Sequence, residues 1–114
     1  TREKDTIRVD IATLDDIFLD RTLDRPVLLK IDVQGSEKDV IAGGQETLKN
    51  VDYVLMEVSF DTMYVGEASF LEIVKEMETL HFQFSHPIAI LKSPNSGKIL
   101  QADILFVNTN PIVA

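Results

Sequence analysis

Two carboxylates lie near the ends of strand-like segments, where a functional carboxylate is expected. Asp32 lies near the end of the apolar run 27–33, and Glu57 lies near the end of the run 53–59. In open α/β sheets, ligands bind beyond the carboxyl ends of the strands, which is where both carboxylates would stand. Asp32 is therefore the first candidate for a functional carboxylate.

Lys30 leaves a structural alternative open for both carboxylates. Side chains alternate along a strand, so Lys30 and Asp32 point to the same face, and Asp32 could pair with Lys30 or cap the following turn. Neighbouring strands lie about 4.8 Å apart, so Glu57 could join Asp32 in one carboxylate cluster, with or without a divalent cation. Glu57 could instead neutralise Lys30, and this structural pair is the favoured interpretation.

Two further polar residues lie within reach of the same region. Glu37 stands in the first turn of a predicted helix, where a negative charge is stabilised by roughly 0.3–1 kcal/mol without any function. His86 precedes Pro87 and could reach the same rim to bind substrate, or it could simply face solvent. The chain has 2 histidines, which are too few for a histidine-rich metal site.

The elements that must position these residues alternate between strand and helix. Strands are expected at Ile7–Ile11, 27–33, 53–59, 82–91 and 98–107, and helices are expected after the capping residues Thr13, Ser36 and Ser69. This order predicts an α/β fold with a mostly parallel sheet, helices packed on it, and a C-terminal antiparallel hairpin.

Glycine and proline residues add detail to two of these predicted elements. Gly43-Gly44 falls inside the helix that begins at Ser36 and costs about 1 kcal/mol per glycine relative to alanine, so close packing of that helix on the sheet is the simplest interpretation. Pro87 places the first arm of the hairpin at a sheet edge or at a bulge. The loop 60–68, which contains Tyr64, could cover an acceptor.

Length and composition exclude several classes of protein. The chain has 114 residues, which fit a single domain spanning 1–114, and its 45% hydrophobic content argues against disorder. The absence of cysteine excludes disulfides, thiol catalysis and zinc–thiolate sites, and favours a reducing, cytoplasmic location. A net charge of -8 without a basic stripe argues against nucleic acid as a partner. No apolar run approaches the roughly 20 residues of a membrane span.

Several segments resemble the C-terminal half of FkbM-family methyltransferases. The residues that carry the resemblance are Thr13-Leu14-Asp15-Asp16, then LKIDVQGSE from Leu29 to Glu37, then IAGGQETL over 41–48, with 55–58 and 103–107 similar to the final strands of the family. The resemblance covers about residues 7–108. It implies a partial Rossmann-like methyltransferase fold and transfer of a methyl group from S-adenosylmethionine to a sugar or another small hydroxyl acceptor.

The resemblance also implies that the cofactor and the acceptor bind to different halves of the domain. The glycine-rich loop of the family, which holds the cofactor, has no counterpart here and is expected upstream of Thr1. The chain would then be the acceptor-side half of the domain and inactive alone. On this resemblance Asp32 and Glu37 are candidate catalytic residues, as acceptor-binding groups or bases, and Glu57 and His86 are candidate substrate-binding residues.

One departure and one alternative accompany that resemblance. Gln34 stands where the family usually has glutamate, and a neutral amide cannot act as a base or add charge to a metal site. The alternative function is a non-catalytic α/β module that binds a partner or assists assembly.

A methyltransferase sheet that lacks its first strand would leave one edge of the strand 27–33 unpaired. Unpaired backbone groups at a sheet edge are a template for another strand. We therefore expect this edge to be covered, either by the strand Ile7–Ile11 or by a second copy of the chain in a homodimer.

Overall fold

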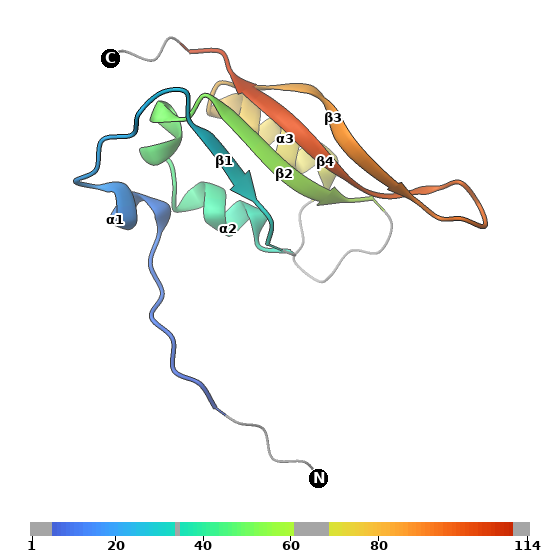
Figure 1. The fold of residues 1–114 in the computed structure, drawn as a ribbon, viewed down its shortest axis with the longest axis horizontal. Coiled ribbons are helices and arrows are strands. Elements are labelled where there is room, and N and C mark those ends of the chain that lie inside the picture. The colour runs from blue at the N-terminus through green and yellow to red at the C-terminus, as the bar shows by residue number, and fades with distance from the viewer. Residues whose placement is uncertain (1–5, 34, 61–68, 111–114) are drawn as a thin grey trace.

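A mixed four-stranded sheet forms the centre of the computed structural model, which describes residues 6–33, 35–60 and 69–110. The elements follow in the order α1 (Leu14–Phe18), β1 (Leu28–Ile31), α2 (Glu37–Ala42), η1 (Thr47–Asn50), β2 (Tyr53–Ser59), α3 (Phe70–Thr79), β3 (Phe82–Lys92) and β4 (Ile99–Asn108). The strand order is β1-β2-β4-β3 (Figure 1). The chain is therefore an α/β protein, as predicted.

The prediction of a mostly parallel sheet is wrong. Only β1 and β2 run parallel among the described strands, whereas β4 is antiparallel to both β2 and β3. The crossover through α2 returns the chain in the same direction, but the hairpin brings β4 back between β2 and β3. The antiparallel hairpin itself is confirmed, and Pro87 lies on the edge strand β3 between two register shifts, as its position predicted.

The predicted strand Ile7–Ile11 is also wrong. Residues 6–13 have no regular structure and extend away from the sheet (Figure 1), with Ile7 79%, Val9 70% and Ile11 93% exposed. An alternating pattern forms a strand only where a neighbouring strand and a buried face are available, and this segment has neither within the described part of the chain. Among the described residues, no strand therefore covers the outer edge of β1.

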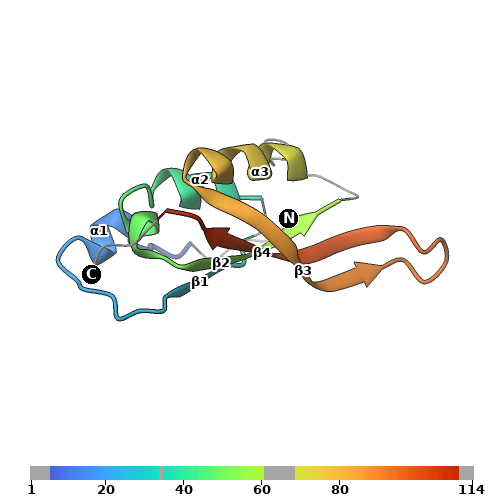
Figure 2. The same ribbon diagram turned by 90° about the horizontal axis from the view of Figure 1, so that it is seen from above.

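The two longer helices lie on one face of the sheet, and no described helix covers the other face (Figure 2). Alternate residues of β2 and β4 point toward α2 and α3 and make the core with them, and Val54, Met56, Ile41, Met77 and Phe106 are each 0% exposed. The period of two in both strands thus separates a packed face from a helix-free face.

The helix starts agree with their capping residues in two cases of three. Thr13 accepts a hydrogen bond from the Asp16 amide at 3.1 Å, and Ser69 forms a reciprocal capping box with Glu72. The third helix, α2, does begin after Ser36, but the Ser36 side chain makes no capping hydrogen bond, and α2 ends at Ala42.

The glycine pair follows the end of α2 and packs closely against the start of α1. A Cβ on Gly43 would lie 3.0 Å from the Thr13 Cβ, and one on Gly44 would lie 3.0 Å from the Leu14 Cδ1. Close packing therefore explains these glycines, but their partner is α1 rather than the sheet.

Candidate functional site

Three carboxylates lie in one row across β1, β2 and β4. Glu57 is paired with Asp103 across the β2–β4 ladder, and Ile31 is paired with Met56 across the β1–β2 ladder. The residue after Ile31 is Asp32, which therefore comes beside Glu57. Since Met56 and Val58 point into the core, the row belongs to the helix-free face. We call Asp32, Glu57 and Asp103 the acidic row.

The surroundings of Glu57 favour its protonated form. Partial burial raises the pKa of Glu57, the negative charges of Asp32 and Asp103 raise it further, and the positive charge of Lys30 only partly opposes them. A carboxylate with a raised pKa holds a proton more tightly and is a stronger base than a solvent-exposed glutamate. The structure thus brings Asp32 near Glu57, the alternative that the sequence left open beside the favoured Lys30–Glu57 pair, and it adds Asp103.

Lys30 does not make the predicted ion pair with Glu57. The ion pairs among the described residues join Arg25 to Asp52 at 2.7 Å, Lys38 to Glu72 at 3.7 Å, and Lys49 to Glu46 at 2.6 Å. Lys30 is exposed and acts on Glu57 only as a nearby charge. Its long side chain can stay in water at little cost, because β1 is covered on one face alone.

The other predicted site residues belong to elements outside this row. Glu37 is 8% exposed in the first turn of α2, within the helical layer. His86 is exposed on β3, with β4 between it and Glu57, and its Nδ1 lies 2.8 Å from the Ser85 hydroxyl. Gln34 and Tyr64 lie outside the described residues, and among those described no three acidic or histidine side chains are placed to share a metal ion.

Sequence reasoning missed Asp103 because it follows from the pairing of two distant strands. A usable signal exists, since Asp103 alternates with Ala102 and Ile104 and therefore points to the face opposite the core. What the sequence does not contain is the insertion of β4 beside β2, which brings Asp103 next to Glu57.

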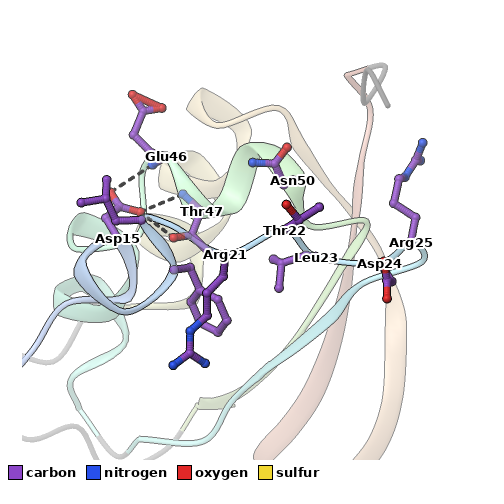
Figure 3. A pocket seen from close by; sticks show the side chains of 11 residues that line it. Asp15, Arg21, Thr22, Leu23, Asp24, Arg25, Glu46, Thr47 and Asn50 are labelled. Atoms are coloured by element: carbon purple, nitrogen blue, oxygen red, sulfur yellow. Dashed lines mark hydrogen bonds between the residues drawn. The ribbon is translucent and has the colours of Figure 1, made fainter.

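The larger hollows lie at the opposite end of the parallel strands. One of about 610 Å³ is bordered by α1, the segment 21–25 and η1 (Figure 3). Beside it, the Asp15 carboxylate accepts hydrogen bonds from the amide and the hydroxyl of Thr47, both at 2.7 Å, and from the Glu46 amide at 3.1 Å. Partial burial opposes ionisation, but these hydrogen bonds outweigh it and lower the pKa of Asp15. They join α1 to η1.

A second set of hydrogen bonds, around Asp52, fixes the start of β1. Asp52 accepts a hydrogen bond from Arg25 Nη2 at 2.7 Å and another from the Val27 amide at 2.7 Å. The bonds from Arg25 and Val27 lower the pKa of Asp52. These hydrogen bonds hold the start of β1 beside β2, so they set the register that brings Asp32 to Glu57.

Fold and site together define an α/β protein whose parallel strand pair ends in carboxylates, the arrangement of a ligand-binding sheet edge. The family model of the methyltransferase FkbM domain matches residues 1–84. The chain belongs to the FkbM methyltransferase family.

A curated relative agrees with this family. The chain is 30% identical over 103 residues to 2-O-methyltransferase NoeI of Sinorhizobium fredii (strain NBRC 101917 / NGR234). The alignment covers 90% of this chain and 38% of NoeI, so the chain spans less than half the length of that relative. No solved structure matches the chain. No described helix is both long and apolar enough to span a bilayer.

Proposed function

We propose that this chain is the acceptor-side half of an S-adenosylmethionine-dependent O-methyltransferase that acts on a sugar or another small hydroxyl compound. The observation that carries the proposal is the acidic row at the carboxyl ends of β1 and β2, in a chain of this methyltransferase family. The name of NoeI, a 2-O-methyltransferase, supports oxygen as the atom that is methylated.

The acidic row suits the work that a hydroxyl acceptor requires. An acceptor oxygen must be held in line and must lose its proton as it is methylated. In the proposal Glu57 takes that proton, because its pKa is raised, and Asp32 accepts a hydrogen bond that orients the acceptor. Glu37 and His86 remain proposed acceptor contacts from α2 and β3.

No described hollow places S-adenosylmethionine beside the acidic row. A ligand of that size needs a hollow of roughly 300 Å³ or more, and two hollows that exceed this volume, about 610 and 620 Å³, border α1, η1 and the end of α3 instead. We propose that a part of the protein upstream of Thr1 holds the cofactor and adds a strand at the edge of β1 that no described strand covers. The cysteine-free composition supports a reducing, cytoplasmic location.

The test uses the longer protein that contains this chain. Labelled S-adenosylmethionine is supplied with a panel of mono- and oligosaccharides, and methylated products are identified. Glu57→Gln is expected to lower kcat by about 100-fold or more, the usual contribution of a general base, and Asp32→Asn to raise KM. Glu78→Gln, the same change on an exposed face of α3, is the matched control and should leave kcat unchanged.

Two results would separate the parts of this proposal. Unchanged activity of Glu57→Gln and Asp32→Asn would refute the site, and the absence of methyl transfer to any hydroxyl would favour the alternative of a binding or assembly module. Calorimetric titration of the 114-residue chain with S-adenosylmethionine should show no micromolar binding. Micromolar affinity would contradict the acceptor-side assignment.

A further inference from the structure

The segment 7–11, which we call the arm, and the outer edge of β1 are both strand-like and both unpaired among the described residues. The arm extends away from the sheet (Figure 1), and no backbone hydrogen bond joins it to another described residue. β1 is the first strand in the sheet order, and the only described strand that pairs with it is β2. An uncovered strand edge is a template for another strand.

The chain that follows the arm is fixed to the domain. Thr13 caps α1, and the Asp15 amide donates a hydrogen bond to the Gly43 carbonyl at 2.9 Å. The arm therefore leaves the domain at Thr13, and its apolar side chains at positions 7, 9 and 11 are all exposed. An alternating segment of this kind forms a strand where a neighbouring strand and an apolar surface are supplied.

The two faces of β1 match the alternation of the arm. Leu29 and Ile31 pack toward the core and the helices, whereas Lys30 and Asp32 are exposed toward the helix-free side. The arm has apolar residues at its odd positions and charged residues at positions 8 and 10. Beside β1, the arm would extend the apolar layer under the helices with one face and the charged side of the sheet with the other.

The charges select one register for this pairing. When an antiparallel arm sets Val9 opposite Ile31, Arg8 comes opposite Asp32. In the same register Asp10 comes opposite Lys30, so both cross-strand pairs join opposite charges. A shift of two residues sets Asp10 opposite Asp32 or Arg8 opposite Lys30, which is unfavourable. None of these four charged side chains makes an ion pair with a described residue.

The backbone of β1 offers hydrogen bonds at the same place. The Val27 carbonyl accepts a hydrogen bond from the Tyr53 amide at 3.1 Å, so the backbone groups of Val27 point to β2. Backbone groups alternate in direction along a strand, and those of Lys30 therefore point to the outer edge. Asp10 opposite Lys30 would form a hydrogen-bonded pair.

We propose that the arm of one copy of this chain pairs antiparallel with β1 of a second copy, with Val9 opposite Ile31. A second copy is the occupant because the arm points away from its own sheet (Figure 1), while each copy offers one arm and one edge of complementary charge. Reciprocal exchange of the two arms closes a two-fold dimer. The partner's Arg8 then lies one strand spacing, about 4.8 Å, from Asp32 and adds a cation at the end of the acidic row.

This inference does not rest on the proposed function. The upstream strand proposed above would compete with the arm for the same edge of β1, so the dimer is proposed for the chain of 114 residues. The methyl-transfer test uses the longer protein, and the tests below measure association of the 114-residue chain, so either proposal can fail without the other.

Two single-cysteine variants test the pairing, because the chain contains no cysteine. Opposed residues on antiparallel strands have Cα atoms about 4.5–5.5 Å apart, which permits a disulfide. Asp10→Cys mixed with Lys30→Cys should give a disulfide-linked heterodimer more than about tenfold faster than Asp10→Cys mixed with Lys75→Cys, since a preformed pair raises the effective thiol concentration. Lys75 is exposed on α3 and is the matched control.

Two outcomes of this experiment would overturn the proposal. The first is an equal rate for the two mixtures. The second is a disulfide that forms within single chains of the double variant while the mixed single variants stay unlinked, because the arm would then cover its own β1.

Sedimentation of the unmodified chain from micromolar to millimolar concentration tests the ionic part. Asp10→Lys should weaken the dimer by at least about twofold, the effect of losing an exposed ion pair in each half, and Lys30→Asp in the same chain should restore it. Asp20→Lys makes the same charge change at an exposed position outside the arm and should not weaken the dimer. A strictly monomeric chain, or equal weakening by Asp10→Lys and Asp20→Lys, would overturn the proposal. Circular dichroism confirms that each variant is folded.

Discussion

Replacement of Asp15 by alanine should destabilise the chain by separating α1 from η1. The carboxylate of Asp15 accepts three hydrogen bonds, two of which come from Thr47 at 2.7 Å. Thr47 is 7% exposed, so water cannot easily replace the lost acceptor, whereas the exposed Glu46 amide can bind water. A buried donor left without an acceptor costs about 1–3 kcal/mol, and with the reorientable hydroxyl included we expect a total loss of about 2–3 kcal/mol.

Urea denaturation of the variant measures this loss, and hydrogen exchange locates it. Asp16→Ala is the matched control, because its backbone amide, not its carboxylate, binds Thr13. The Thr47 amide should exchange faster in Asp15→Ala alone. Because the pKa of Asp15 is lowered in the folded chain, its contribution is present above the unfolded pKa near 3.8 and is lost as pH falls through the folded value. A loss below about 0.5 kcal/mol with Thr47 still protected would refute the reasoning.

Three further predictions concern capping, close packing and the acidic row. Ser69→Ala should cost about 0.5–2 kcal/mol in denaturant melts, whereas Ser36→Ala should cost almost nothing, because only Ser69 accepts a capping hydrogen bond. Gly43→Ala should destabilise by about 1–3 kcal/mol, because its Cβ would meet Thr13 at 3.0 Å, and a gain in stability would contradict that contact. Glu57→Gln should stabilise the chain at pH 7, because a raised pKa means that ionised Glu57 opposes folding. The difference in stability between this variant and the unchanged chain should vanish below pH 4.5, where Glu57 is protonated in both the folded and the unfolded chain. A variant that is less stable at pH 7 would contradict this reasoning.

The sequence predicted those parts of the fold that depend on neighbouring residues. The helix that begins after the capping residue Ser69 and the C-terminal hairpin are both local patterns, and the structure contains them. The strand at Ile7–Ile11 failed because alternation alone does not supply a neighbour. The parallel sheet failed because the position of β4 is decided by which apolar face it covers, and that choice involves the whole core.

Part of the candidate site could likewise be predicted from the sequence, and part of it could not. Asp32 and Glu57 could be predicted to meet, because each lies near the carboxyl end of its strand and the helix crossover makes those strands parallel. Asp103 enters the site through a ladder between β2 and β4, and that pairing has no local signal. The favoured Lys30–Glu57 pair failed since it assumed burial on both faces of β1, and the described helices cover only one.

The acidic residues with shifted pKa values form two groups, according to whether their surroundings lower or raise the pKa. Asp15, Asp52 and Glu72 accept hydrogen bonds from nearby donors, and the pKa of each is lowered, so their ionised forms stabilise the fold. Glu57 has burial and two carboxylates around it, and its pKa is raised. A group whose ionised form is disfavoured in the folded chain opposes folding at neutral pH, and perturbed groups of this kind gather at functional sites. The same comparison that makes the first three acids structural therefore makes Glu57 the residue on which the proposed chemistry depends.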